Sequence, residues 1–172
     1  VMDLVANNLS YKPDDQYHLN EVSFNFKEGN LYTILGRTLS GKTTLLKTIA
    51  GLLTPDSGEI EFDGKNFLKV PVWERNVAMV YQQFINYPHL NVFENIAFPL
   101  KQRKIDQSVI NEKVMDALKS VGLLGYENRK IQELSGGQQQ RVSLARSLVK
   151  NAKILLLDCL LYTSDAADDD TR

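Results

Sequence analysis

A glycine-rich stretch in the first third of the chain carries the clearest chemical signal. Gly36 is followed, after four residues, by Gly41, Lys42 and Thr43, which fits the phosphate-binding pattern G-x-x-x-x-G-K-[ST]. Glycines let the backbone turn its N–H groups toward phosphate oxygens, and the lysine ammonium and threonine hydroxyl can bind phosphate and Mg²⁺. The alternative is an ordinary glycine-rich turn. The predicted phosphate cradle consists of Gly36, Arg37, Thr38, Leu39, Ser40, Gly41, Lys42, Thr43 and Thr44.

This motif has to stand between a strand and a helix. An apolar run at residues 31–35 predicts the strand, and the apolar spacing of residues 42–52, which stop near Gly51, predicts the helix. We expect Pro99 to end a later helix. The order of elements predicts an α/β fold that opens with an antiparallel sheet. The other predicted strands lie at residues 2–6, 22–26, 59–62, 77–81 and 154–157, and the other predicted helices at residues 91–98, 106–121 and 138–149.

Asp158 directly follows the apolar run Ile154–Leu157. An acidic residue at the carboxyl end of a buried parallel strand lies where open α/β sheets bind their ligands. Phosphate-loop NTPases hold Mg²⁺ through an aspartate in such a position. We therefore interpret Asp158 as a metal-site residue that works together with Thr43 of the loop, rather than as a turn or helix-cap residue.

A second helix start also has the residues of an anion site. Ser135, Gly136 and Gly137 offer a hydroxyl, backbone N–H groups and the positive end of a helix dipole. The alternative is an ordinary cap between two helices. The surrounding run LSGGQQQR, at residues 134–141, resembles the signature of the ATP-binding-cassette (ABC) ATPases, and the resemblance extends over residues 3–158.

The resemblance implies a fold, cofactors and site residues. It implies a phosphate-loop NTPase core with an antiparallel β subdomain and an inserted helical subdomain at about residues 83–136. The implied cofactors are ATP, bound by the loop, and Mg²⁺. Thr43, Gln82 and Asp158 are expected to contact Mg²⁺ or the attacking water, which makes Gln82 and Asp158 the expected catalytic residues.

The family resemblance also implies a head-to-tail dimer of two ATPase protomers. The residues expected at the γ-phosphate bound by the opposite protomer are Ser135, Gly136, Gly137 and Gln138. An aromatic residue in the polar loop before the second strand is expected to stack on adenine. Tyr17 is the first candidate and Tyr11 the second, and a half-exposed loop tyrosine without a ligand is an equally good interpretation of either.

One stretch narrows the resemblance to importers. The run PVWERNVAMVYQQFINYP, at residues 71–88, resembles ATPase subunits of importers for maltose, glycerol 3-phosphate, glycerol and other small carbohydrates. This implies a location at the cytoplasmic face of the cell membrane, with permease subunits bound through the region after Gln82. Packing within the helical subdomain is the alternative for each expected contact. These contacts are Phe84, Ile85, Tyr87 and Leu90.

Composition excludes several other classes. The 172 residues predict one domain, and 43% hydrophobic with 24% charged residues is ordinary for a globular chain. A net charge of -1, without a basic cluster that contains aromatics, gives no indication of a nucleic-acid partner. The single cysteine, Cys159, excludes an intramolecular disulfide and a cysteine-based zinc site. We find no signal peptide or long apolar span.

The family pattern stops after Asp158. The family has a glutamate next, followed by further elements and a switch histidine, whereas this chain continues with Cys159 and leucines. We expect a domain at residues 1–158 that is incomplete at its C-terminal end, and an acidic, disordered or artefactual tail at residues 159–172. Hydrolysis of ATP by the chain should then be impaired. The alternatives are a non-hydrolytic ATP-dependent dimerisation module and a soluble ABC ATPase that acts in DNA repair or on ribosomes.

Overall fold

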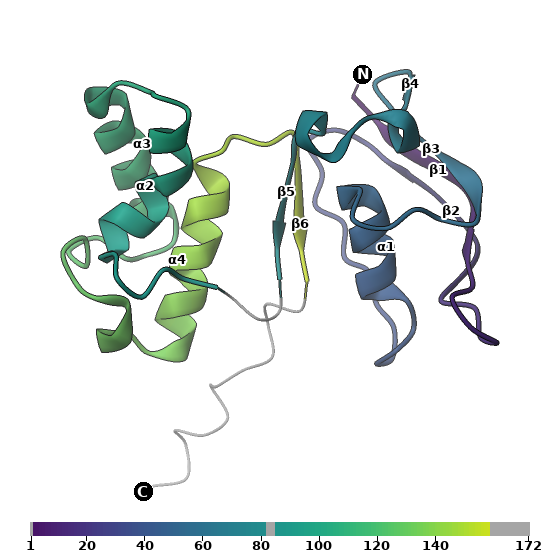
Figure 1. Cartoon of the computed structure of the whole chain (residues 1–172), viewed down its shortest axis with the longest axis horizontal. Helices are drawn as coiled ribbons and strands as arrows, with labels where there is room; N and C mark the ends of the chain where they lie inside the picture. The colour runs from purple at the N-terminus through teal and green to yellow at the C-terminus, as the bar shows by residue number, and fades with distance from the viewer. Residues whose placement is uncertain (1, 82–84, 159–172) are drawn as a thin grey trace, which may run out of the picture. The chain divides into compact units, whose positions relative to one another are not determined.

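The computed structural model describes residues 2–81 and 85–158 of the chain (Figure 1). The chain forms two compact units, Val1–Asn76 and Val77–Arg172. Within the described residues, no helix combines the length and the apolar character needed to cross a lipid bilayer. The predicted subdomain limits, at about residues 83 and 136, stay a prediction.

The first unit contains an antiparallel sheet with the strand order β2-β1-β3-β4. Its strands are β1 (Leu4–Tyr11), β2 (Leu19–Phe26), β3 (Ser57–Phe62) and β4 (Lys65–Asn66). The predicted antiparallel entry sheet is confirmed. The prediction that Tyr11 lies in the loop is wrong, because Tyr11 pairs with Leu19 at the end of β1. Asp63 and Gly64, with φ of 53° and 70°, form the tight turn between β3 and β4.

The helix predicted after the phosphate loop is α1 (Lys42–Ala50), which ends at Gly51 with a left-handed φ of 82°. It buries Leu45, Leu46 and Ile49. The strand predicted at residues 31–35 is wrong: this segment is irregular, and Leu31 and Leu35 are 89% and 87% exposed. An apolar run needs a neighbouring strand to complete its hydrogen bonds, and no described strand pairs with this one. Two short 3-10 helices, η1 (Phe67–Lys69) and η2 (Val72–Glu74), complete the unit.

The second unit contains a parallel pair of strands, β5 (Val77–Val80) and β6 (Ile154–Leu157), in the register Val77 to Ile154. Parallel pairing across more than seventy intervening residues is typical of an α/β fold. Leu156 is buried, but Leu155 and Leu157 on the opposite face of β6 are exposed. The predicted strand at residues 154–157 is confirmed, but it is buried on one face only among the described residues, because side chains alternate between the two faces of a strand.

Helices α2 (Val92–Gln102), α3 (Gln107–Ser120) and α4 (Gly136–Leu148) form the other part of this unit, together with the 3-10 helix η3 (Ile131–Glu133) (Figure 1). Asn91 and Glu94 form the predicted capping box of α2. Pro99 does not end this helix as predicted. The next residue, Leu100, is fully buried, so packing keeps the last turn helical despite the missing N–H group. The core residues on the three helices are Val92, Ile96, Ala97, Leu100, Ile110, Val114, Ala117, Leu118, Val142 and Ala145.

Candidate functional site

The two glycines of the phosphate loop have different close neighbours, backbone at Gly41 and the Ser40 side chain at Gly36. Gly41 has a left-handed φ of 86°, and a Cβ atom at this position would lie 1.9 Å from the backbone oxygen of His18. A Cβ atom at Gly36 would lie 2.4 Å from Ser40 Oγ. The glycines therefore let the loop fold back on itself and on the start of β2, as the phosphate-binding pattern predicts. This also makes His18 part of the loop's support.

Lys42, the first residue of α1, holds this loop together. Its ammonium donates hydrogen bonds to the carbonyl oxygens of Gly36 and Arg37, both at 2.6 Å, and to Ser40 Oγ at 3.3 Å. Ser40 N–H closes a turn on the Arg37 carbonyl at 3.1 Å. Residues 36–40 are all exposed, and Leu39 has a left-handed φ of 66°. A curled, solvent-exposed loop with one cation at its centre suits a phosphate group.

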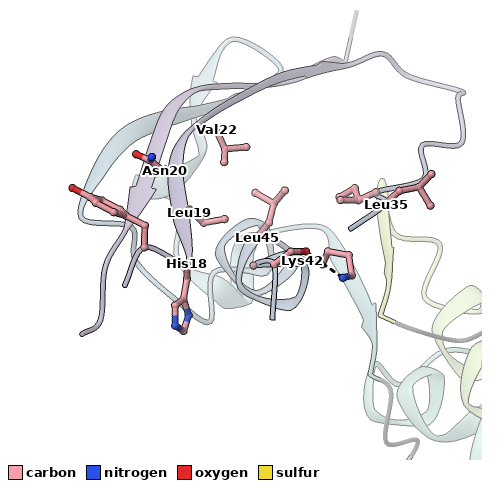
Figure 2. A pocket seen from close by; sticks show the side chains of 11 residues that line it. His18, Leu19, Asn20, Val22, Leu35, Lys42 and Leu45 are labelled. Carbon is pink, nitrogen blue, oxygen red and sulfur yellow. Dashed lines mark hydrogen bonds between the residues drawn. The ribbon is translucent and has the colours of Figure 1, made fainter. Parts of the chain in front are cut away.

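A pocket of about 320 Å³ opens beside the loop (Figure 2). It is lined by residues at the start of β2, by Ile34 and Leu35, by the end of the loop and by Leu45 of α1. Tyr17 lines the pocket, is 57% exposed, and lies under the Lys12 ammonium at 5.2 Å from the ring centroid. The volume of the pocket falls in the range of small-molecule sites.

The second candidate for adenine stacking occupies a different place. Tyr11 does not line the pocket, and its ring packs edge-on against the ring of His18, with 6.1 Å between centroids. His18 itself lines the pocket, and its Nδ1 lies 3.4 Å from the hydroxyl of Thr44. His18 could not be predicted as a site residue from the sequence. It belongs to no motif, and no known spacing relates it to Thr44, which lies 26 residues later.

In the second unit, Asp158 lies just beyond the carboxyl end of β6. It is 5% exposed, and its N–H donates a hydrogen bond to the Val80 carbonyl at 2.9 Å, so it sits beside the end of β5. This is the expected position at the ends of two parallel strands. Gln82, the other expected residue at this edge, lies outside the described residues.

The expected metal-site residues offer oxygen donors, the ligand type that Mg²⁺ prefers. Within residues 2–81 and 85–158, no three His, Cys, Asp or Glu side chains come together to hold a metal ion. Mg²⁺ is commonly bound by one or two protein oxygens together with the phosphates of its substrate. The carboxylate of Asp158 and the hydroxyl of Thr43, which belong to different units, are each an oxygen ligand of that kind.

The start of α4 is a complete helix cap. Ser135 Oγ accepts the N–H of Gln138 at 3.3 Å, and Gln138 Oε1 accepts the N–H of Ser135 at 2.9 Å. Gly136 and Gly137 have no heavy atom within 4 Å of a notional Cβ among the described residues. The ordinary-cap interpretation therefore describes the geometry of Ser135, while nothing in this unit's packing requires the two glycines.

The segment expected to contact a permease divides into exposed and packed residues. Ile85 is 71% exposed. Tyr87 packs on Phe98 of α2, with 4.5 Å between ring centroids, and Leu90 is half-buried. Phe84 lies outside the described residues. Tyr87 thus follows the alternative of packing within the helices, and Ile85 keeps an accessible apolar side chain.

Two curated relatives are ATP-binding proteins of spermidine/putrescine import. The spermidine/putrescine import ATP-binding protein PotA of Mycoplasma capricolum subsp. capricolum is 48% identical to this chain over 155 residues. Its counterpart in Mycoplasma mycoides subsp. mycoides is 47% identical over the same length. Each comparison covers 90% of this chain and 44% of the relative, so the chain spans less than half the length of these curated relatives.

Solved structures share the fold. CbiO1 from Clostridium perfringens, part of the ABC transporter complex cbiONQ, superimposes with a TM-score of 0.78 at 30% identity over 90% of this chain and 64% of its own. The dimeric ATP-binding cassette MJ0796, in a post-hydrolysis state with ADP and Pi, gives 0.80 at 32% identity over 95% and 76%. Residues 19–159 also match the family model described as ABC transporter. The chain belongs to the ABC transporter family and has the phosphate-loop fold of its ATPases.

Proposed function

We propose that this chain is the nucleotide-binding part of an importer's ATPase subunit, which binds ATP and Mg²⁺ and hydrolyses ATP to drive uptake. The observation that carries the proposal is the phosphate loop. Its lysine ammonium lies at the centre of a ring of loop oxygens, at the N-terminus of α1. A phosphate group that replaces these oxygens as the hydrogen-bond partner of Lys42 gains a charge-assisted contact. It is also stabilised by the positive end of the α1 helix dipole.

The loop residues Gly36–Thr44 surround the phosphates in this proposal, and the neighbouring pocket takes the base and sugar. Tyr17 is the preferred adenine-stacking residue, because it lines the pocket and its ring is accessible. Tyr11 is the alternative, since it supports the pocket only through His18. Phosphate–protein contacts fix the nucleotide, while stacking adds affinity without requiring a hydrogen-bonded match to the base.

Thr43, Gln82 and Asp158 hold Mg²⁺ in this proposal. The ion, when bound, neutralises charge on the phosphate oxygens. Asp158 is suited to this because it is buried at the end of β6 and its backbone is bonded to the end of β5. Gln82 positions the attacking water in the same proposal. Its place in sequence, shortly after β5, agrees with this edge of the sheet.

A second ATPase protomer completes the proposed site. Ser135, Gly136, Gly137 and Gln138 would contact the γ-phosphate held by the opposite protomer. The dimeric state of the solved MJ0796 cassette, which holds ADP and Pi, supports this arrangement. The open space at both glycines supports it as well, because a phosphate could approach the backbone there.

The proposed partners on the other side are permease subunits, at the cytoplasmic face of the membrane, contacted through Ile85 and the residues after Gln82. We infer a polyamine as cargo, because relatives named for spermidine and putrescine import are nearly half identical to this chain. The carbohydrate or polyol expected from the sequence is the alternative. Vesicles that contain the full-length subunit and its permease should take up labelled spermidine but not glycerol 3-phosphate, and the reverse result would favour the carbohydrate class.

Loss of nucleotide affinity in Lys42→Ala tests the ATP site itself. Removal of one charge-assisted contact, worth about 1.5–3 kcal/mol, should weaken ATP binding roughly tenfold or more. Lys47→Ala, at the far end of the same helix, is the matched control, because Lys47 is exposed and lies one turn from the C-terminus. Titration of both variants with ATP decides the matter. Equal affinity in the two would remove the loop from the proposal.

The rate of hydrolysis by this chain is a separate proposal. Cys159 stands where the family has a glutamate, and a water-orienting carboxylate contributes about 10²- to 10⁴-fold. A thiol with a reference pKa of about 8.5 is a poor substitute at pH 7. We expect slow release of phosphate from the chain, and faster release from a protein with Cys159→Glu and the family's downstream elements. Equal rates would show that residues 159–172 supply the missing chemistry.

A further inference from the structure

Asn95, in the first half of α2, is buried with all of its amide atoms in hydrogen bonds. Its Oδ1 accepts from the N–H of Tyr87 at 2.8 Å and from Nη1 of Arg146 at 3.3 Å. The two N–H groups of its Nδ2 are shared among three carbonyl oxygens, those of Tyr87, Leu90 and Asn91, at 3.0, 3.1 and 2.9 Å. A single side chain therefore fixes the backbone of the segment 85–91 onto α2.

Arg146 fixes the same segment onto α4. Its Nη2 donates to the carbonyl oxygen of Ile85, its Nη1 donates to Asn95, and its guanidinium stacks over the ring of Tyr87, 5.0 Å from the centroid. Burial lowers the pKa of Arg146 from its usual value, and the interaction with Tyr87 raises it. Hydrogen bonds of a partly desolvated cation are stronger than those of an exposed one.

A third contact joins the segment to the beginning of α4. Asn86 Nδ2 donates to the carbonyl oxygen of Gln139 at 2.9 Å, in the first turn of the helix. Gln139 and Arg146 lie two helical turns apart. The segment 85–91 is therefore bonded to α4 at two separated points and to α2 at a third, and one of the points on α4 lies in its first turn.

We propose that Arg146 and Asn95 are positioning residues that couple the segment 85–91 to the start of α4, so that a permease acting on the exposed Ile85 moves Ser135 and Gly137. This inference rests on the proposed function, which places the permease at one end of this network and a nucleotide of the opposite protomer at the other. The network gives the displacement a contiguous, hydrogen-bonded path within one compact unit.

Arg146→Lys tests this coupling. Lysine keeps the positive charge, but one ammonium cannot reproduce the forked geometry that bonds Asn95 and Ile85 together. The matched control is Arg129→Lys, because the Arg129 guanidinium also stacks on a tyrosine of this unit, Tyr126 at 4.5 Å, without binding the segment 85–91. The assays use the full-length subunit, alone and assembled with its permease subunits in lipid vesicles.

We expect Arg146→Lys to leave ATP affinity and hydrolysis by the free subunit within twofold of the unchanged protein. The change in hydrolysis caused by the permease should shrink by about two- to thirtyfold, and Arg129→Lys should retain it. Amide exchange at Tyr87 should also become faster in Arg146→Lys alone, because its acceptor Asn95 loses its second anchor.

Other results overturn the inference. If the permease affects Arg146→Lys and the control equally, the network does not couple the two ends. A parallel fall in ATP affinity, hydrolysis by the free subunit and melting temperature would assign Arg146 a purely structural role. Failure of the unchanged subunit to bind ATP would instead reject the proposed function, and is recognised before any variant is compared.

Discussion

Two helices of this protein begin at glycine-rich loops, but their N-termini are built differently. At α1, the N-cap is Gly41 in a left-handed conformation, and no side chain of the described residues caps the helix. At α4, the N-cap is Ser135, whose hydroxyl and backbone N–H both exchange hydrogen bonds with Gln138. The first helix start therefore has a glycine cap in a left-handed conformation, while the second is completed by its own side chains.

This difference indicates which features of a glycine-rich helix start are required for the fold and which are available for binding. Glycine at position 41 is fixed by the chain itself, because the backbone of His18 occupies the space of a side chain. Gly136 and Gly137 meet no such neighbour among the described residues. If these glycines have a function, the reason for them lies in what approaches α4 from outside the unit.

The largest effect that follows from this comparison is expected for Gly41→Ala. Left-handed backbone costs a residue with a Cβ about 1–2 kcal/mol, and the clash with the His18 carbonyl has to be relieved by moving one of two backbones. We expect a free energy of unfolding lower by at least about 2 kcal/mol, and ATP affinity lower by more than about tenfold. Chemical unfolding followed by titration with ATP measures both. Near-normal stability would show that the loop relaxes around the new side chain.

The sequence predicted elements whose stability depends on their own periodicity. The 3.6-residue spacing in α3 places Ile110, Val114 and Leu118 in the core, and the spacing after Gly41 predicts the helix that the structure has at Lys42–Ala50. Residues 31–35 have equally suitable side chains, but a strand also depends on a partner, which its own residues do not encode.

Contacts between distant backbone atoms were not predictable in the same way. The carbonyl of His18 under Gly41 involves no side chain, so neither residue type nor spacing signals it. The Arg146 side chain bonds to the Ile85 carbonyl, and this backbone acceptor likewise carries no signal in residue type or spacing. The apolar residue Leu100, which keeps Pro99 inside α2, is visible in the sequence, but its burial depends on the packing of three helices.

A smaller effect is expected at the other helix start. Ser135→Ala removes the acceptor for the Gln138 N–H and half of a reciprocal cap, which typically costs about 1 kcal/mol. Ser120→Ala is a matched control, since that hydroxyl only donates back to the Asp116 carbonyl within α3. Chemical unfolding of both variants provides the comparison. Equal stability of the two variants would mean that the cap adds nothing to folding.

The smallest expected effect concerns Gly137, and it has the opposite sign. Alanine in place of a helical glycine reduces the entropy of the unfolded chain, and Gly137 has open space and no left-handed φ, so Gly137→Ala should raise the free energy of unfolding by about 0.5 kcal/mol. The same methyl group would stand where a phosphate of the opposite protomer is proposed to approach. ATP-dependent dimerisation, measured by light scattering on the full-length subunit, should therefore weaken while stability rises. A variant that is more stable and dimerises normally would show that the approach of a phosphate from the opposite protomer does not require glycine at position 137.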